Sequence, residues 1–214
     1  MKNLFCGVVF LLAATLFNSA QAVEVVKTTY LGNGNLNYPF VVVENPAVEK
    51  KINLEIFAEV ERFLAQVKRT SAELGVETES VTISFEVPCN YEFGILSVVL
   101  TEYVYFEKAA HPATYRRALN FNSDSGQRIF ASSLTGISPD ENGEYAYSPK
   151  NLTLKLREYA EKNKLELYRD FQQLIKIPED FYFDENLHVH FIFQQYEVAP
   201  YAAGIIEFDA TPKK

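Results

Sequence analysis

Three histidines and one glutamate are the residues of this chain best suited to chemistry. His188 and His190 lie two positions apart among apolar residues. On a β-strand their side chains would share one face, about 6 to 7 Å apart. Together with His111 and Glu197 they could form a three-histidine metal site with a carboxylate base, as in a metal-dependent hydrolase. Because a His-x-His pair also arises by chance on half-exposed strands, this site is an alternative, and we expect no bound cofactor.

Other signatures of catalysis are absent from the sequence. It has no glycine-rich phosphate loop, no Gly-x-Ser-x-Gly nucleophile elbow and no His-Glu-x-x-His motif. Cys89 has no obvious base nearby in the sequence, and the role of a small buried hydrophobic residue suits it better than that of a reactive thiol. We therefore expect a protein that binds a partner without catalysing a reaction.

Residues 193–204, near the C-terminus, have the composition of a binding loop. Polar, aromatic and backbone-bending residues replace the apolar alternation that precedes them. Tyrosine rings suit recognition because they are large and amphipathic, and proline and glycine give a loop a defined shape. The same residues also suit a structural corner, in which the carboxylate would stabilise the backbone instead of meeting a cationic partner. The candidates are Tyr196, Glu197, Pro200, Tyr201 and Gly204.

A second candidate loop contains His111 and Pro112. Proline disfavours a helical conformation of the residue before it, so the backbone at His111 should be extended. Its imidazole could bond to a neighbouring carbonyl group or face a pocket. We expect this loop and the loop at 196–204 to approach each other and form one recognition surface.

The hydrophobic pattern predicts the elements that must position these loops. Residues 81–87 alternate strictly between apolar and polar, and apolar residues recur at three- and four-residue spacing between Asn45-Pro46 and Gly75. The pattern predicts an α+β fold, mainly an antiparallel sheet packed against two or three helices. The predicted helices cover 46–74, 149–159 and 165–175, and the predicted strands cover 23–31, 38–43, 81–87, 95–106, 119–121, 128–130, 181–183, 187–194 and 205–209.

Residues 1–22 have the pattern of a signal peptide. Lys2 precedes a short apolar run, and Ala20-Gln21-Ala22 supplies small residues for cleavage. We therefore expect a secreted or periplasmic protein with no membrane-spanning segment. The formal net charge of −8 argues against nucleic acid as a partner and is consistent with a basic one.

Two motifs give the chain a family resemblance. Ala109-Ala110-His111-Pro112, followed by Asn120-Phe121-Asn122, and the run from Gln195 to Gly204 resemble the signatures of a family known from RsiV-type anti-sigma factors and peptidoglycan deacetylases. The resemblance implies a C-terminal RsiV-like domain over 125–214 and an N-terminal companion domain over 23–124. The chain has Ala109 where the family often has glycine, and it lacks the membrane helix and cytoplasmic segment of an anti-sigma factor.

The resemblance also implies a function. Members of this family sense lysozyme, or accompany a separate catalytic domain that acts on peptidoglycan. We therefore expect an exported, non-catalytic binding module that recognises a cell-wall component or a wall-acting protein such as lysozyme. The residues that the resemblance assigns to binding are His111, Pro112, Tyr196, Glu197, Pro200, Tyr201 and Gly204. The alternatives are the metal-dependent hydrolase and an envelope assembly protein without a small ligand.

Overall fold

The computed structural model describes residues 23–90, 94–136 and 145–212. Within these ranges the chain forms two α-helices and three antiparallel sheets, which confirms the predicted α+β class. The predicted signal peptide lies outside the described residues. No helix in the described ranges is long and apolar enough to cross a membrane.

A hairpin and a long helix begin the fold. Strands β1 (Glu24–Thr29) and β2 (Asn37–Val42) pair antiparallel, with the 3₁₀ turn η1 (Tyr30–Gly32) between them. Helix α1 (Pro46–Leu74) begins after Asn45, whose side chain accepts a hydrogen bond from the backbone of Ala47. It ends at Gly75, where φ is +64°, a conformation that favours glycine. Both predicted helix boundaries are therefore confirmed.

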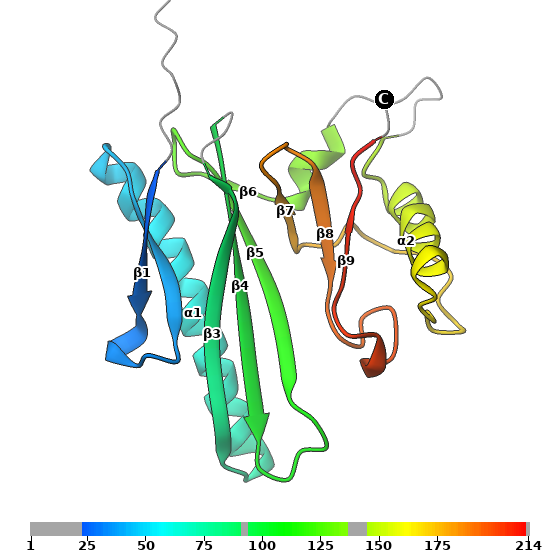
Figure 1. Ribbon diagram of the computed structural model, residues 1–214, viewed down its shortest axis with the longest axis horizontal. Helices are drawn as coiled ribbons and strands as arrows, with labels where there is room; N and C mark the ends of the chain where they lie inside the picture. The colour runs from blue at the N-terminus through cyan, green and yellow to red at the C-terminus, as the bar shows by residue number, and fades with distance from the viewer. Residues whose placement is uncertain (1–22, 91–93, 137–144, 213–214) are drawn as a thin grey trace, which may run out of the picture.

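Helix α1 lies along a four-stranded sheet in the order β3-β4-β5-β6 (Figure 1). The strands are β3 (Thr78–Asn90), β4 (Ile95–Phe106), β5 (Ala113–Asn122) and β6 (Arg128–Ile129). The alternation predicted at 81–87 is confirmed, because Ile83 is buried and the polar residues on either side of it are exposed. The first hydrophobic core forms between this sheet, the hairpin and the buried stripe of α1, namely Val48, Ile52, Ile56, Val60, Phe63 and Val67.

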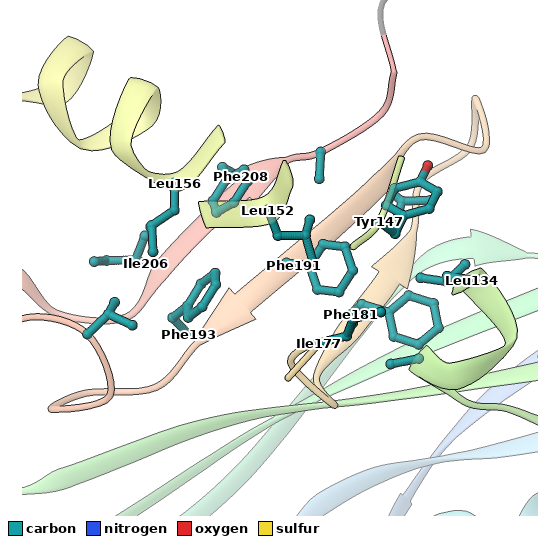
Figure 2. Packing of buried hydrophobic residues seen from close by; sticks show 14 of the residues in the cluster. Leu134, Tyr147, Leu152, Leu156, Ile177, Phe181, Phe191, Phe193, Ile206 and Phe208 are labelled. Carbon is teal, nitrogen blue, oxygen red and sulfur yellow. The ribbon is translucent and has the colours of Figure 1, made fainter. Parts of the chain in front are cut away.

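The C-terminal half builds a second core. Turn η3 (Ala131–Gly136) and helix α2 (Pro149–Asn163) are followed by strands β7 (Phe181–Phe183), β8 (Val189–Phe193) and β9 (Ile206–Asp209), with turn η4 (Tyr201–Ala203) before β9. The three strands form one antiparallel sheet in that order. Figure 2 shows the aromatic rings of this sheet gathered against α2, with Phe181, Phe191 and Phe193 almost fully buried.

A buried polar network joins the two halves. Ser97 on β4 donates a hydrogen bond to the side chain of Asn120 on β5, over 2.7 Å. The amide of Asn120 donates to the backbone oxygen of Phe181 over 2.6 Å, and the backbone N–H of Phe183 donates to Ser97 over 3.0 Å. Strand β7 is therefore fixed against β4 and β5 by groups that have no access to water, which makes its position specific.

The helix predicted over 165–175 is wrong. These residues form turns and irregular backbone instead. Their backbone groups find partners outside the segment: the N–H of Leu174 donates to the hydroxyl of Thr153, the N–H of Tyr168 donates to the backbone oxygen of Val198, and Arg157 donates to two backbone oxygens of the segment. Apolar side chains of this segment, such as Leu165 and Phe171, nevertheless pack on the second core. Their positions in the sequence therefore resemble the apolar spacing of a helix.

Candidate functional site

The two loops singled out in the sequence meet in the structure. The ring of His111 stacks on the ring of Tyr201 with centroids 3.7 Å apart, and its Nε2 lies 2.8 Å from the hydroxyl of Tyr196. The two tyrosine rings lie 5.7 Å apart. We call His111, Tyr196 and Tyr201 the aromatic cluster. Its members come from the β4–β5 connection and from the segment between β8 and β9, at the end of β8 where the chain turns into η4 (Figure 1).

The carbonyl oxygen of Pro112 fixes the arrangement of the rings. It lies 3.1 Å from Nδ1 of His111 and 3.2 Å from the hydroxyl of Tyr201. A carbonyl group can only accept, so Nδ1 must carry a proton here and donate it, and Tyr201 donates as well. In a neutral imidazole, Nε2 is then the acceptor for the hydroxyl of Tyr196. The stacked pair and the tautomer are thus set by one backbone oxygen.

Tyr196 is the exposed member of the cluster. Its side chain is 53% exposed, and its backbone has a φ of +66°, in the left-handed region that residues other than glycine rarely adopt. The neighbouring turn helps to hold it there, because the N–H of Glu197 donates to the backbone oxygen of Gln194 and the carboxylate of Glu197 accepts from the N–H of Gln194. A strained backbone that presents an exposed aromatic ring is typical of functional positions.

Two side chains at the end of β8 and one before β7 also bind the free edge of β5. The backbone N–H groups of Thr114, Arg116 and Ala118 donate to the side chains of Gln195, Gln194 and Asp180, respectively. The amide of Gln194 donates in return to the backbone oxygen of Arg116 over 2.7 Å. These bonds replace a strand that would otherwise pair with this edge. They also hold the two loops of the aromatic cluster together.

The other predicted site residues shape the loop. Pro200 precedes η4 and is exposed, and Gly204 ends it with φ +70° and ψ −155°, a backbone region essentially restricted to glycine. Glu197 is exposed at the surface, but its carboxylate bonds inward to the N–H of Gln194, and the partial burial of that group raises its pKa from the ordinary value. Of the seven predicted binding residues, the structure therefore brings four together at the rings, and the other three set the conformation of the chain beside them.

The alternative metal site is not assembled. His188 and His190 both lie near the carboxylate of Asp184, at 3.2 and 3.3 Å, and His190 also stacks on Tyr182. The two histidines lie at the start of β8, His188 just before it and His190 within it, whereas His111 is bonded to the segment that follows the end of β8. Among residues 23–90, 94–136 and 145–212, no group of three or more histidine, cysteine or acidic side chains is arranged to hold a metal ion. Cys89 is buried, as its prediction required.

A buried charged residue between α1 and the first sheet was missed in the sequence. Glu102 on β4 is buried, Arg62 of α1 lies 3.5 Å from its carboxylate, and neither carboxylate oxygen has a hydrogen bond among the described residues. Burial raises the pKa of Glu102 to about 8. A signal was present, because Glu102 follows Leu96, Val98 and Leu100 at the two-residue spacing of a buried face.

Comparison with known proteins first supports the fold. Two solved structures are similar over nearly the whole chain: a DUF3298 family protein from Pseudomonas aeruginosa PAO1, at 16% identity, covering 88% of this chain and 89% of that one with a TM-score of 0.56, and one from Bacteroides fragilis, at 16% identity, covering 87% of each chain with a TM-score of 0.53. At this level of identity the similarity establishes a shared fold.

A family model also matches the C-terminal part of the chain. Residues 137–210 match the family described as Protein of unknown function (DUF3298), a stretch that includes α2, the β7–β9 sheet and the loop with Tyr196 and Tyr201. No curated protein matches the chain. The RsiV-type relationship and the N-terminal companion domain stay predictions.

Proposed function

We propose that this chain is an exported, non-catalytic binding module that recognises its partner with the aromatic cluster. The partner we propose is a cell-wall component or a basic wall-acting protein such as lysozyme. The observation that carries the proposal is the exposed ring of Tyr196, held in a left-handed backbone conformation and bonded to His111, which is 85 residues away in the sequence. Backbone strain of this kind clusters at binding sites, and here it presents an exposed ring.

The rigidity of the cluster supports recognition. Tyr201 and His111 are fixed by stacking and by their shared bond to Pro112, so little conformational entropy remains to be lost when a partner binds. Tyrosine also has few rotatable bonds for the area that it buries, which is one reason that it is enriched at energetically important interface positions. The net charge of −8 would attract a basic partner over long range.

An exposed apolar groove favours a second candidate function, docking to another envelope protein. Tyr38 and Phe40 of β2 and Leu54 and Phe57 of α1 line a cavity of about 350 Å³. Leu54 and Phe57 are 56% and 39% exposed. Exposed apolar surface of this kind is typical of contacts between proteins. This function would not involve the aromatic cluster. A variant of the cluster, such as Tyr196→Ala, would therefore leave docking at the groove unchanged, which distinguishes the two functions.

Isothermal titration calorimetry at low salt tests the leading proposal. Lysozyme and soluble peptidoglycan fragments are titrated separately into the wild-type protein, Tyr196→Ala and a control, Tyr145→Ala, which removes an exposed tyrosine outside the cluster. We expect binding of one of the two ligands, weakened about tenfold or more by Tyr196→Ala and unchanged by Tyr145→Ala, because interface tyrosines often contribute more than about 1.4 kcal/mol. Absence of heat with both ligands, or equal affinity of all three proteins, would contradict the proposal.

A further inference from the structure

The junction of the two halves contains a charged cavity of about 360 Å³. Helix α1, strands β5 and β6, and the residues before β7 all contribute to its walls. The charged groups that line it are three arginines and three acids, namely Arg62, Arg117, Arg128, Glu59, Glu179 and Asp180. None of them belongs to the aromatic cluster, so the cavity is a separate place on the molecule.

Two of the arginines are already neutralised by acids of the same cavity. Arg62 donates to the carboxylate of Glu59, with Nε 2.9 Å from an oxygen. Arg117 donates to Asp180 over 2.8 Å. In each of these close pairs the arginine and the carboxylate neutralise each other. The third acid, Glu179, lies at the solvent-exposed rim and pairs with Lys176 over 3.8 Å.

Arg128 is the arginine of the cavity with the longest contacts to its acceptors. Its Nε has no hydrogen-bond partner in the described part of the chain. Its other nitrogens lie 3.5 Å from the backbone oxygen of Ala118 and 3.9 Å from the carboxylate of Glu55, both longer than an ordinary hydrogen bond. Burial lowers the pKa of Arg128 from its usual value. The guanidinium has therefore lost water without gaining an equivalent partner.

Aromatic rings hold this guanidinium in place. Its central carbon lies 5.4 Å from the ring centre of Phe121 and 5.5 Å from that of Phe130. Phe121 is fully buried, and Phe130 lines the cavity. Contacts of a guanidinium with aromatic faces are favourable and leave its N–H groups free to bind in the plane. Arg128 is thus fixed before any ligand arrives.

We propose that the cavity binds a small monocarboxylate, such as the C-terminal end of a peptide, through the guanidinium of Arg128. A planar guanidinium with free donors matches a carboxylate in a bidentate geometry. The balance of charges selects a single negative charge, because Arg128 is the one arginine lining the cavity with no carboxylate within hydrogen-bond distance, and a phosphate dianion would face Glu59 and Asp180. Phe130 would cover the apolar part of the ligand.

Nuclear magnetic resonance of the arginine Nε–Hε groups tests this proposal directly on the wild-type protein. The probes are N-acetylalanine, its uncharged amide N-acetylalaninamide, and inorganic phosphate. We expect a saturable shift of the Arg128 signal with N-acetylalanine, little change with the amide, and weaker binding of phosphate. The exposed Arg69 on α1 is an internal control whose signal should not move.

Arg128→Gln and Arg69→Gln provide matched variants for titration with N-acetylalanine. We expect Arg128→Gln to weaken binding about tenfold or more, since a charge-assisted bidentate pair is lost, and Arg69→Gln to leave it unchanged. If Arg128→Gln fails to fold, the arginine spectra of the wild-type protein still test whether N-acetylalanine binds at Arg128. Equal shifts at both arginines, the same response to the amide, tighter binding of phosphate, or no saturation would each overturn the proposal.

Discussion

At the scale of single residues, the most unusual group is the buried carboxyl of Glu102. It occupies a core-facing position of β4, where the fold otherwise places leucine and valine, and it has no hydrogen bond in the described part of the structure. Burial raises its pKa from 4.5 to about 8. The folded protein therefore binds this proton more tightly than the unfolded chain does.

This residue should make stability depend on pH. The contribution of Glu102 to the free energy of unfolding should be fully present below the ordinary pKa of 4.5 and should be lost as pH rises toward about 8, because each pKa unit corresponds to about 1.4 kcal/mol. Glu102→Gln should flatten this dependence and be more stable than the wild type near pH 8. Urea unfolding at several pH values measures the effect, with exposed Glu79→Gln as control. If the free energies of unfolding of the wild type and of Glu102→Gln rose in parallel from pH 4.5 to about 8, the raised pKa of Glu102 would be contradicted.

The backbone of Tyr196 makes a second prediction at this scale. Tyr196→Ala and Tyr196→Gly both remove the ring and its bond to His111, but only glycine relieves the left-handed conformation at φ +66°. We expect the glycine variant to be more stable than the alanine variant by about 1 kcal/mol. Denaturant unfolding of both variants checks this difference. Equal stabilities would mean that the backbone relaxes and that no strain is held there.

At the scale of elements, the segment between α2 and β7 depends on side chains of the helix. The hydroxyl of Thr153 donates to the backbone oxygen of Pro149 and accepts from the N–H of Leu174 over 2.9 Å. Thr153→Val keeps the shape of the side chain and leaves that N–H without its partner. We expect a loss of about 1 to 3 kcal/mol in the free energy of unfolding, whereas Thr153→Ser should cost less. A valine variant as stable as the wild type would show that water replaces the bond.

The same segment shows where the sequence pattern fails. Helix α1 was predictable because its cap, its apolar stripe and the terminal glycine agree, and strand β3 because its alternation is strict. Residues 165–175 have helical spacing, yet their backbone bonds come from Thr153, Arg157 and Val198, partners that no local pattern can indicate.

The candidate sites also differ in how far the sequence could predict them. The candidate loops could be found because tyrosine, proline and glycine interrupt an apolar strand, and His-Pro marks the second loop. Their contact through the Pro112 oxygen depends on tertiary structure. The cavity at Arg128 depends on it even more, since its charged residues come from α1, β5, β6 and the segment before β7, and each of them alone looks like an ordinary surface charge.

At the scale of the whole molecule, two hydrophobic cores are joined by a junction that combines polar contacts with a small buried cluster of Val99, Ala118, Tyr182 and Ile192. The first lies between α1 and the β3–β6 sheet, and the second between α2 and the β7–β9 sheet. Between them lie the Ser97–Asn120 network, the cavity at Arg128 and the contacts of Gln194 and Gln195 with β5. The aromatic cluster belongs to this junction as well, because each half contributes one of its loops. Its geometry therefore depends on how the halves are held together.

Hydrogen–deuterium exchange in the presence of saturating lysozyme, and separately of soluble peptidoglycan fragments, tests most directly whether the aromatic cluster is the recognition surface. We predict that one of these ligands slows exchange in residues 109–114 and 195–204, and leaves the β1–β2 hairpin unchanged. Protection confined to the hairpin and the apolar groove of α1, or no protection with either ligand, would contradict recognition by His111, Tyr196 and Tyr201.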